Sequence, residues 1–336
     1  MPMQLQIQQN IDILKCPSCS SEMVHHADKL ICIENRHEFE IVNGIPLLFE
    51  DDKCNERNLN LTQKTKLFYE EYPFPNYDDF ENPESLISKA GASVFAKQIN
   101  EELPFNTRIL EVGCGTGQLT NYLSLSNRIV IGTDISYSSL ALGNDFKIRN
   151  SLKRSSFYQM NLFKPVFKDE SFHTVICNGV LHHTPDPFKG FQSIVQLLKR
   201  KGYIIIGLYN LYGRLATHLR RGIFNITGNR LKGIDPYLRR ADVGDTKKHA
   251  WFMDQYKNPH ETTHTMGEVL KWFDSTGVEF VTSIPDSYIP IDEYNNPHLF
   301  SKTRRSSYFS RLISQLSMIL RFRNEGGFFI MIGRKH

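Results

Sequence analysis

Long apolar runs are absent from this sequence of 336 residues. None approaches the roughly 18 residues that a membrane-spanning helix needs. The opening, MPMQLQIQQN, lacks the basic start and apolar core of a secretion signal, and no internal repeat or low-complexity tract follows. We therefore expect a cytoplasmic globular protein without a transmembrane segment, long enough for two domains or for one large domain with appendages.

The sequence also has no large excess of positive or negative charge, and it contains few cysteines. The 40 Lys and Arg residues nearly balance the 36 Asp and Glu residues, and a net charge of +4 does not by itself require a nucleic-acid or membrane partner. Hydrophobic residues at 40% and aromatic residues at 12% exclude a wholly disordered chain. The six cysteines, in a large chain without a secretion signal, are more typical of thiols or metal ligands than of disulfides.

Composition divides the chain into three regions. Residues 1–52 hold three of the six cysteines, residues 53–104 are polar and predict a helical connector or lid, and residues 105–336 alternate β-rich runs with amphipathic helical patterns. Such alternation indicates an α/β fold with parallel strands. The expected strands are RILEVG, RIVIGTDI, FYQMNLF, FHTVICNGV, GYIIIGLYN, VEFVTSIP and GFFIMIGR. Two insertions, 211–264 and 287–325, follow strand ends and should wall a substrate pocket.

A glycine-rich loop follows the first of these strands. The segment RILEVGCGTGQL places Gly113, Gly115 and Gly117 between a strand and a helix, where a ligand can approach backbone amides and the positive end of the helix. A dinucleotide fingerprint needs a further glycine where Gln118 stands, so NAD is disfavoured. Glu111 would repel a pyrophosphate but suits a ligand that carries an ammonium and a sulfonium. The pattern favours S-adenosylmethionine.

The next two strand ends add polar groups. Asp134 lies about 20 residues past the glycines, where a carboxylate can accept hydrogen bonds from ribose hydroxyls. Asn161 ends the third strand with an amide that can contact an adenine edge, while Leu162 and Phe163 pack on the ring. A glycine loop alone fits an ordinary strand-to-helix turn, whereas the loop together with the acidic strand end favours a cofactor site.

The motifs EVGCGTG, GTDIS and NGVLHHTPDP, followed by an amphipathic helix and a GYIII strand, resemble the class I S-adenosylmethionine-dependent methyltransferases. The resemblance covers about residues 105–210 and is greatest to the type 11 branch that includes quinone-biosynthesis methyltransferases. It implies a seven-stranded Rossmann-like sheet with an antiparallel last strand, which residues 278–334 fit. The cofactor contacts that it implies are Glu111, Gly113, Cys114, Gly115, Gly117, Asp134, Ile135, Asn161, Leu162 and Asn178. The family more often has Asp at position 161.

Methyl transfer depends mainly on positioning and on water exclusion, with a base only where the acceptor must lose a proton. His182 and His183 end the fourth strand, where the methyl group should lie, and a neutral imidazole there can take a proton from a hydroxyl or an acidic carbon. Loop packing or helix capping is the alternative role. The sequence reads NGVLHH instead of the Asn/Asp-Pro-Pro-aromatic motif of base-amine methyltransferases, which leaves oxygen, carbon and ring-nitrogen acceptors.

The segment PHETTH contains the HExxH pattern of zinc proteases. A proline precedes it, and the capping box of Thr265 and Glu268 follows it, so we expect a loop instead of a metal-binding helix. The polar cluster that it forms would contact the substrate, with a solvated loop as the alternative. The candidate substrate residues are Tyr256, His260, Glu261 and His264.

The N-terminal region has metal-ligand spacing. Cys16 and Cys19 form a CxxC pair, and Cys32 with His37 forms a second pair. Three thiols and an imidazole suit a closed tetrahedral zinc site, whose metal would contribute much of the folding free energy of so short a segment. The segment resembles the zinc ribbons of some ribosomal-RNA guanine methyltransferases and of small partners of translation-related methyltransferases. We predict a zinc-ribbon-like domain over residues 1–52 with a structural zinc ion.

Three functions follow from these features. The leading hypothesis is methyl transfer to an oxygen or carbon of a small-molecule acceptor. The alternative is an rRNA or tRNA methyltransferase guided by the ribbon and by a basic insertion, and the third is a non-catalytic binding protein. The basic residues are Arg214, Arg220, Arg221, Arg230, Lys232, Arg239 and Arg240.

Two further segments leave alternatives open. The aromatic residues between Phe68 and Tyr77 would either close over a ligand or pack in the core. The basic stretch 301–323 would either form a cap helix or touch a membrane surface.

Overall fold

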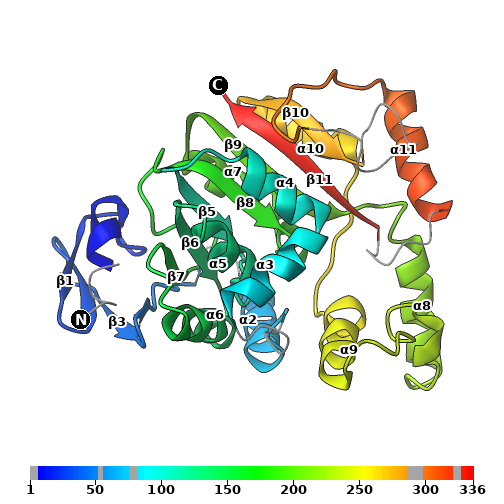
Figure 1. The fold of residues 1–336 in the computed structure, drawn as a ribbon, viewed down its shortest axis with the longest axis horizontal. Helices are drawn as coiled ribbons and strands as arrows, with labels where there is room; N and C mark the ends of the chain where they lie inside the picture. Colours follow the sequence, from blue (N-terminus) through cyan, green and yellow to red (C-terminus); the bar gives the residue numbers. More distant parts are fainter. Residues whose placement is uncertain (1–6, 52–55, 76–81, 286–297, 321–326) are drawn as a thin grey trace.

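The computed structural model describes residues 7–51, 56–75, 82–285, 298–320 and 327–336. Tyr77, residues 287–297 and residues 321–325, which belong to the predictions above, lie outside the described residues. Figure 1 shows a central sheet with helices on both faces, a small N-terminal unit at one end and helices of the two insertions at the other.

The central sheet has seven strands in the order β10-β11-β9-β8-β5-β6-β7. Strands β5 to β9 run parallel, and β11 pairs antiparallel with both β9 and β10. This confirms the predicted seven-stranded sheet with an antiparallel last strand. The strands are β5 (Arg108–Val112), β6 (Ile129–Asp134), β7 (Ser155–Gln159), β8 (Phe172–Asn178), β9 (Leu198–Tyr209), β10 (Val278–Ile284) and β11 (Phe328–Lys335).

Helices cover both faces because the strands alternate between two cores. In β9, Ile204 and Ile206 join one buried cluster and Ile205 joins the other, as a strand buried on both faces requires. The α-helices are α2 (Glu56–Glu71), α3 (Pro83–Ala92), α4 (Val94–Glu102), α5 (Gln118–Ser124), α6 (Tyr137–Arg149), α7 (Pro187–Gln196), α8 (Leu215–Ile226), α9 (Asp245–Phe252), α10 (Met266–Ser275) and α11 (Tyr308–Leu320). Helices α7 and α10 pack on the first core, and α3, α4 and α5 pack on the second.

Short helices fill several connections. The 3-10 helices span Ile11–Ile13, Leu181–His183 and Lys232–Ile234, and a π-helix spans Met253–Lys257 directly after α9. Helix α10 begins as predicted: the Thr265 side chain accepts a hydrogen bond from the Glu268 amide at 3.2 Å. Within the described ranges no helix combines the length and apolar character that crossing a bilayer requires.

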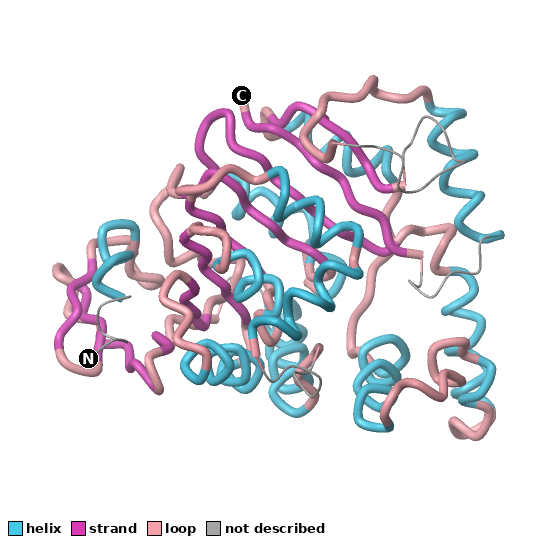
Figure 2. Tube along the Cα trace, viewed as in Figure 1, coloured by secondary structure: helices cyan, strands magenta, loops and turns pink. Residues whose placement is uncertain are grey.

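The N-terminal unit is a four-stranded antiparallel sheet that docks on the edge strand β7 (Figure 2). Leu47 bridges to Gln159 in parallel orientation, and the Leu48 amide donates to the Gln159 carbonyl at 3.0 Å. Leu14 and Leu48 are fully buried in the same core as the strands of the large sheet. The unit thereby covers an otherwise open sheet edge. Its strands are β1 (Met23–His26), β2 (Lys29–Cys32), β3 (Glu38–Val42) and β4 (Ile45–Pro46).

Candidate functional site

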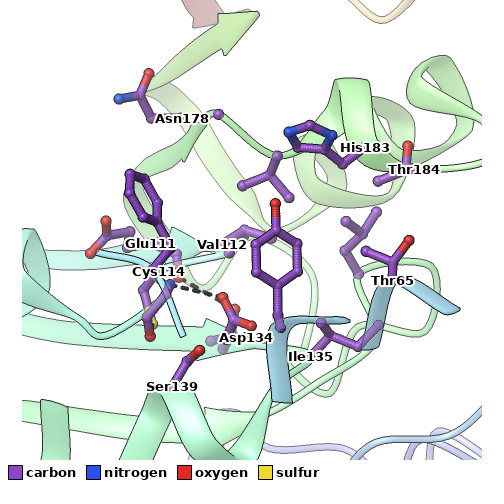
Figure 3. A pocket seen from close by; sticks show the side chains of 18 of the residues that line it. Thr65, Glu111, Val112, Cys114, Asp134, Ile135, Ser139, Asn178, His183 and Thr184 are labelled. Carbon is purple, nitrogen blue, oxygen red and sulfur yellow. Dashed lines mark hydrogen bonds between the residues drawn. The ribbon is translucent and has the colours of Figure 1, made fainter. Parts of the chain in front are cut away.

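A cavity of about 570 Å³ opens at the carboxyl ends of β5, β6 and β8 (Figure 3). Helix α2, the π-helix and the segment that follows β7 supply further parts of its lining. Gly117 does not line the cavity. The predicted residues that do line it are Glu111, Gly113, Cys114, Gly115, Asp134, Ile135, Asn161, Leu162, Asn178 and His183. The fold therefore brings most of the residues predicted to bind the cofactor to one cavity, and their contacts with the cofactor stay a prediction.

The glycine loop needs glycine for its backbone and for close packing. Gly113, Gly115 and Gly117 have φ angles of 67°, 53° and 70°, in the left-handed region. A Cβ at Gly117 would lie 2.3 Å from the Phe157 ring, and a Cβ at Gly115 would lie 2.2 Å from the Phe74 carbonyl oxygen. Gly117 also provides the N-cap of α5. Its role is therefore to shape the turn, while the other two glycines present their backbone to the cavity.

Two buried carboxylates lie beside this loop. Burial raises the pKa of Glu111 to about 7, although the Thr120 hydroxyl donates a hydrogen bond to it. Burial also raises the pKa of Asp134 to about 6, although its oxygens accept from the amides of Gly115 at 2.8 Å and Ser136 at 2.9 Å. A ligand that brings positive charge and hydroxyl donors would stabilise both carboxylates in their ionised forms.

Asn161 lines the cavity, but its amide is bonded to the backbone. Its Nδ2 donates to the carbonyl of Glu50 at 2.8 Å, and its Oδ1 accepts from the Phe163 amide at 3.1 Å. The sequence predicts that this amide contacts an adenine edge. Each end of the amide is bonded to protein backbone, which ties the N-terminal unit to the cavity, but an amide nitrogen has two N–H groups and only one donates to Glu50, so the adenine contact stays a prediction.

The two adjacent histidines have different environments. His183 lines the cavity, and its Nδ1 lies 2.7 Å from the His260 carbonyl oxygen. Because a carbonyl only accepts, Nδ1 carries the proton and Nε2 keeps a lone pair. Burial lowers the pKa of His183, so the ring is neutral at pH 7. Figure 3 shows this ring across the cavity from Asp134.

His182 is fully buried and does not line the cavity. Its ring lies 4.0 Å from the Tyr209 ring, centroid to centroid. A ring enclosed in this way cannot reach an acceptor. The prediction of a catalytic His182 is therefore corrected, and the loop-packing alternative describes this residue.

The four predicted substrate residues lie behind the cavity wall, and none of them lines the cavity. Tyr256 packs on Phe224 and donates its hydroxyl proton to Asp235. His264 lies 3.0 Å from Glu268 through its Nδ1. The PHETTH segment is a loop, as predicted, so a protease-like helix is absent there. The direct-contact assignment of Tyr256, His260, Glu261 and His264 is corrected to a supporting position.

Glu261 is the centre of a buried ion-pair cluster. Its Oε2 lies 2.7 Å from Arg214 and 2.8 Å from Arg221. Burial alone would raise its pKa, but the two guanidinium groups lower the pKa of Glu261 to about 2. Arg214 itself is fully buried. The predicted basic surface of the insertion is smaller than its sequence indicates, because Arg214 is buried, Arg221 is half-buried, and both pair with Glu261.

The insertion 211–264 supplies part of the opposite wall, as the sequence predicts, although sequence patterns single out neither Trp251 nor Gln255. Trp251, Asp254 and Gln255 line the cavity from the end of α9 and from the π-helix. Tyr69 and Phe74 also line it, which fits the alternative in which the aromatic segment closes over a ligand. A π-helix has no periodic sequence pattern comparable to that of an α-helix, so only the polar composition near position 254 pointed to this wall.

The predicted metal ligands lie together. The ligand atoms of Cys16, Cys19, Cys32 and His37 all lie within 4.8 Å of one another. Cys16 Sγ is 3.4 Å from His37 Nδ1, and Cys19 Sγ is 3.4 Å from Cys32 Sγ. Three sulfurs and one imidazole nitrogen in this arrangement fit a tetrahedral zinc ion.

Comparisons with known proteins agree with this geometry. Residues 110–206 match the family described as a methyltransferase domain. An uncharacterized protein of Synechococcus is 25% identical over 250 residues, covering 66% of this chain and 60% of that protein. A ubiquinone biosynthesis O-methyltransferase of Haemophilus ducreyi is 30% identical over 110 residues, covering 32% of this chain and 47% of that protein.

Among solved structures, PKMT2 from Rickettsia typhi has a similar fold, with a TM-score of 0.50 at 15% identity over 72% of this chain and 52% of that chain. The chain spans 60% and 47% of the lengths of the two curated relatives described above. The strand order, the glycine loop at its cavity and the family match over residues 110–206 together show that the chain carries a class I S-adenosylmethionine-dependent methyltransferase domain.

Proposed function

We propose that the protein transfers the methyl group of S-adenosylmethionine to an oxygen atom of a small-molecule acceptor, with an acidic carbon as the alternative atom. The observation that carries this proposal is the combination, in one cavity, of two buried carboxylates with a neutral imidazole. The carboxylates suit the cationic donor, and the imidazole suits an acceptor that must lose a proton. A volume of about 570 Å³ falls within the range of small-molecule sites.

The cofactor would lie along the glycine loop. Glu111 would face its ammonium group, and Asp134 would accept hydrogen bonds from its ribose hydroxyls. Leu162 and Phe163 would pack on the adenine ring, and the second N–H of the Asn161 amide would contact its edge. Asn178 would lie on the sulfonium side. Glu111, Asp134 and Asn178 are thereby assigned according to the charge and polarity that they bring to the cavity.

When bound, the cofactor supplies a methyl group activated by a positively charged sulfur. His183 would accept the proton of the acceptor hydroxyl at Nε2 while the new oxygen–carbon bond forms and the sulfur–carbon bond breaks. The His260 carbonyl fixes the ring orientation through Nδ1. Tyr69 and Phe74 exclude water from the reacting atoms. The products would be the methylated acceptor, S-adenosylhomocysteine and a proton that His183 returns to solvent.

The choice of oxygen is supported by the acid–base state of His183 and by the name of the Haemophilus ducreyi relative, which is an O-methyltransferase. The RNA alternative has weaker support, because Arg214 and Arg221 are bound to Glu261 and do not form a basic surface for RNA phosphates. We also propose that Cys16, Cys19, Cys32 and His37 bind a structural zinc ion.

The test uses purified protein, a metabolite extract, an RNA fraction and S-adenosylmethionine with an isotopic label in its methyl group. We expect the label in a small-molecule methyl ether, and none from Asp134→Ala. Asp145→Ala, which removes an exposed carboxylate on α6, is the matched control and should transfer normally. Label found only in RNA, or a protein that does not bind the cofactor in calorimetry, would overturn the proposal.

A further inference from the structure

A third carboxylate in the cavity has no part in the proposed cofactor site. Asp254 lines the cavity from the π-helix and is 7% exposed. In the proposed site Glu111 faces the ammonium of the cofactor and Asp134 its ribose. No group of the cofactor is assigned to Asp254. No lysine or arginine is found among the described residues that line this cavity. Asp254 is therefore available to whatever binds beside the cofactor.

Two neutral groups hold the Asp254 carboxylate in position. The Tyr69 hydroxyl donates to its Oδ1 at 3.1 Å across 185 residues of sequence, and the Gln255 amide donates to its Oδ2 at 2.9 Å. The Tyr69 hydroxyl in turn accepts from the Asn258 amide at 2.9 Å. An ionised carboxylate has about four lone-pair positions, so further donors can still bind to it.

The nearby guanidinium of Arg214 is bound to other protein groups. Arg214 stacks on the Tyr209 ring, with its guanidinium carbon 3.6 Å from the ring centroid, and pairs with Glu261. It also donates to the Gln255 side-chain carbonyl at 2.5 Å. Arg214 does not line the cavity. A ligand in the cavity therefore meets the Asp254 carboxylate directly and meets the guanidinium only through Gln255.

The walls around Asp254 are aromatic. Rings of Tyr69, Tyr209, Trp251 and Phe328 line the cavity, and the Tyr69 and Tyr209 ring centroids lie 6.4 and 5.9 Å from that of His183. Such rings favour a flat partner, and their faces also attract a cation. A negatively charged partner would instead face three carboxylates in a site without a cationic side chain.

We infer that Asp254 binds a hydrogen-bond donor of the acceptor, so that the acceptor is a hydroxylated ring that is neutral or positively charged and an anionic ring is rejected. This inference rests on the proposed function, since it assigns the acceptor of the same cavity. The hydroxyl would face His183 and the donor group would face Asp254.

The test compares three phenols of similar shape: tyramine, a cation; 4-ethylphenol, a neutral molecule; and 4-hydroxyphenylacetate, an anion. Each is titrated at pH 7.5 into protein saturated with S-adenosylhomocysteine, and calorimetry gives the dissociation constants. We expect tyramine, whose ammonium can donate to Asp254, to bind at least about tenfold more tightly than the anion, which corresponds to about 1.4 kcal/mol, with 4-ethylphenol between the two. Equal or tighter binding of the anion, or no binding of any of the three, would overturn the inference.

Variants separate Asp254 from a general charge effect. Asp254→Asn keeps the side-chain shape and should bring the three dissociation constants within about threefold of one another. Asp242→Asn removes an exposed carboxylate of the same insertion and should leave the preference unchanged. Tyr69→Phe removes the donor to Oδ1 but keeps the charge, so the preference for non-anionic phenols should persist. Preference retained by Asp254→Asn, in a variant that melts like the wild type, contradicts the inference.

The same experiment distinguishes the two proposals. Failure of S-adenosylhomocysteine to bind would count against the proposed function itself. Normal binding of S-adenosylhomocysteine, with phenol affinities that do not depend on charge, would count against Asp254 alone.

Discussion

Asn161 joins the N-terminal unit to the cavity, because its amide donates to the Glu50 carbonyl at 2.8 Å. Glu50 lies shortly after the backbone pairing of Leu48 with Gln159. The segment that follows the cysteine cluster thus runs along β7 and ends at the cavity wall. Loss of order in the N-terminal unit should therefore weaken cofactor binding.

Cys16→Ser tests this connection. If the proposed zinc ion is bound, the variant should lose it and should have a lower melting temperature, because a bound metal would supply folding free energy to so small a unit. Cofactor affinity should fall about tenfold, the value of about one hydrogen bond. Mass-spectrometric metal analysis, thermal unfolding and calorimetry measure the three effects. His26→Ala, an exposed substitution in β1, should change none of them. Unchanged metal content in Cys16→Ser would contradict the zinc assignment.

Short sequence patterns predicted the features that depend on neighbouring residues, namely the strands and the metal-ligand spacing. The β-rich runs gave all seven strands, and the cysteine and histidine spacing gave the four residues that the structure brings together. The partners of Asn161, Glu261 and Asp254 lie 111, 47 and 185 residues away in the sequence, at Glu50, Arg214 and Tyr69. No periodicity encodes such tertiary pairs, so these three roles emerged only from the fold.

The adjacent histidines illustrate the same limit. Sequence placed His182 and His183 together at a strand end, but the 3-10 turn over Leu181–His183 directs only one of them to the cavity. The carbonyl that orients His183 belongs to His260, 77 residues later. A pair that looks equivalent in sequence therefore divides into one packing residue and one candidate base.

Glu261→Gln should destabilise the fold strongly. The substitution leaves Arg214 fully buried beside a neutral amide, and breaking one side of a buried ion pair costs about 3–5 kcal/mol. The free energy of unfolding by urea measures this loss. Glu279→Gln, which removes the partly exposed carboxylate partner of the exposed Lys302, should change it by less than about 1 kcal/mol. A loss that small in Glu261→Gln would show that the cluster is not a structural support.

The pH dependence of Glu261 has a defined sign. Its pKa is about 2 in the folded protein against an ordinary value of 4.5, so the ionised form stabilises the fold above pH 4.5. This contribution should disappear as the pH falls from about 4.5 to 2. The difference in unfolding free energy between wild type and Glu261→Gln should shrink over that interval. A difference that stays constant down to pH 2 would contradict the lowered pKa.

Ionisation of Glu111 should have the opposite effect on stability to ionisation of Glu261. Its pKa of about 7 lies above the ordinary value of 4.5, so the folded protein holds a proton that the unfolded chain has lost. Between pH 4.5 and 7 the unliganded wild type should lose stability relative to Glu111→Gln, by an amount on the order of 3 kcal/mol. Urea unfolding at several pH values measures the difference. A constant difference across this interval would contradict the raised pKa of Glu111.

Cofactor binding should release protons for the same reason. A cationic ligand favours the ionised form of Glu111, so binding at pH 6.5 should expel part of a proton, and affinity should rise from pH 5.5 to 7. Calorimetry in buffers with different ionisation enthalpies counts these protons. Glu111→Gln should release fewer, while Glu84→Gln, an exposed substitution near the start of α3, should match the wild type. Equal proton release from Glu111→Gln and wild type would place the linked group elsewhere.

His183→Asn should slow methyl transfer without weakening cofactor binding. The asparagine amide can still donate to the His260 carbonyl, so the loop geometry is kept while the lone pair at Nε2 is lost. With the acceptor identified by the labelling experiment, kcat should fall by about 10²–10⁴ while the cofactor Kd stays the same. His298→Asn, at an exposed position, provides the control.

The pH profile distinguishes a base from a packing residue at position 183. Burial lowers the pKa of His183 below its ordinary value of 6.5. In the wild type the rate should therefore fall toward low pH as the imidazole takes up a proton, with the midpoint of this acid limb below pH 6.5. The residual rate of His183→Asn should lack this acid limb, since its amide does not titrate. An acid limb of the same midpoint in both proteins would show that another group accepts the proton.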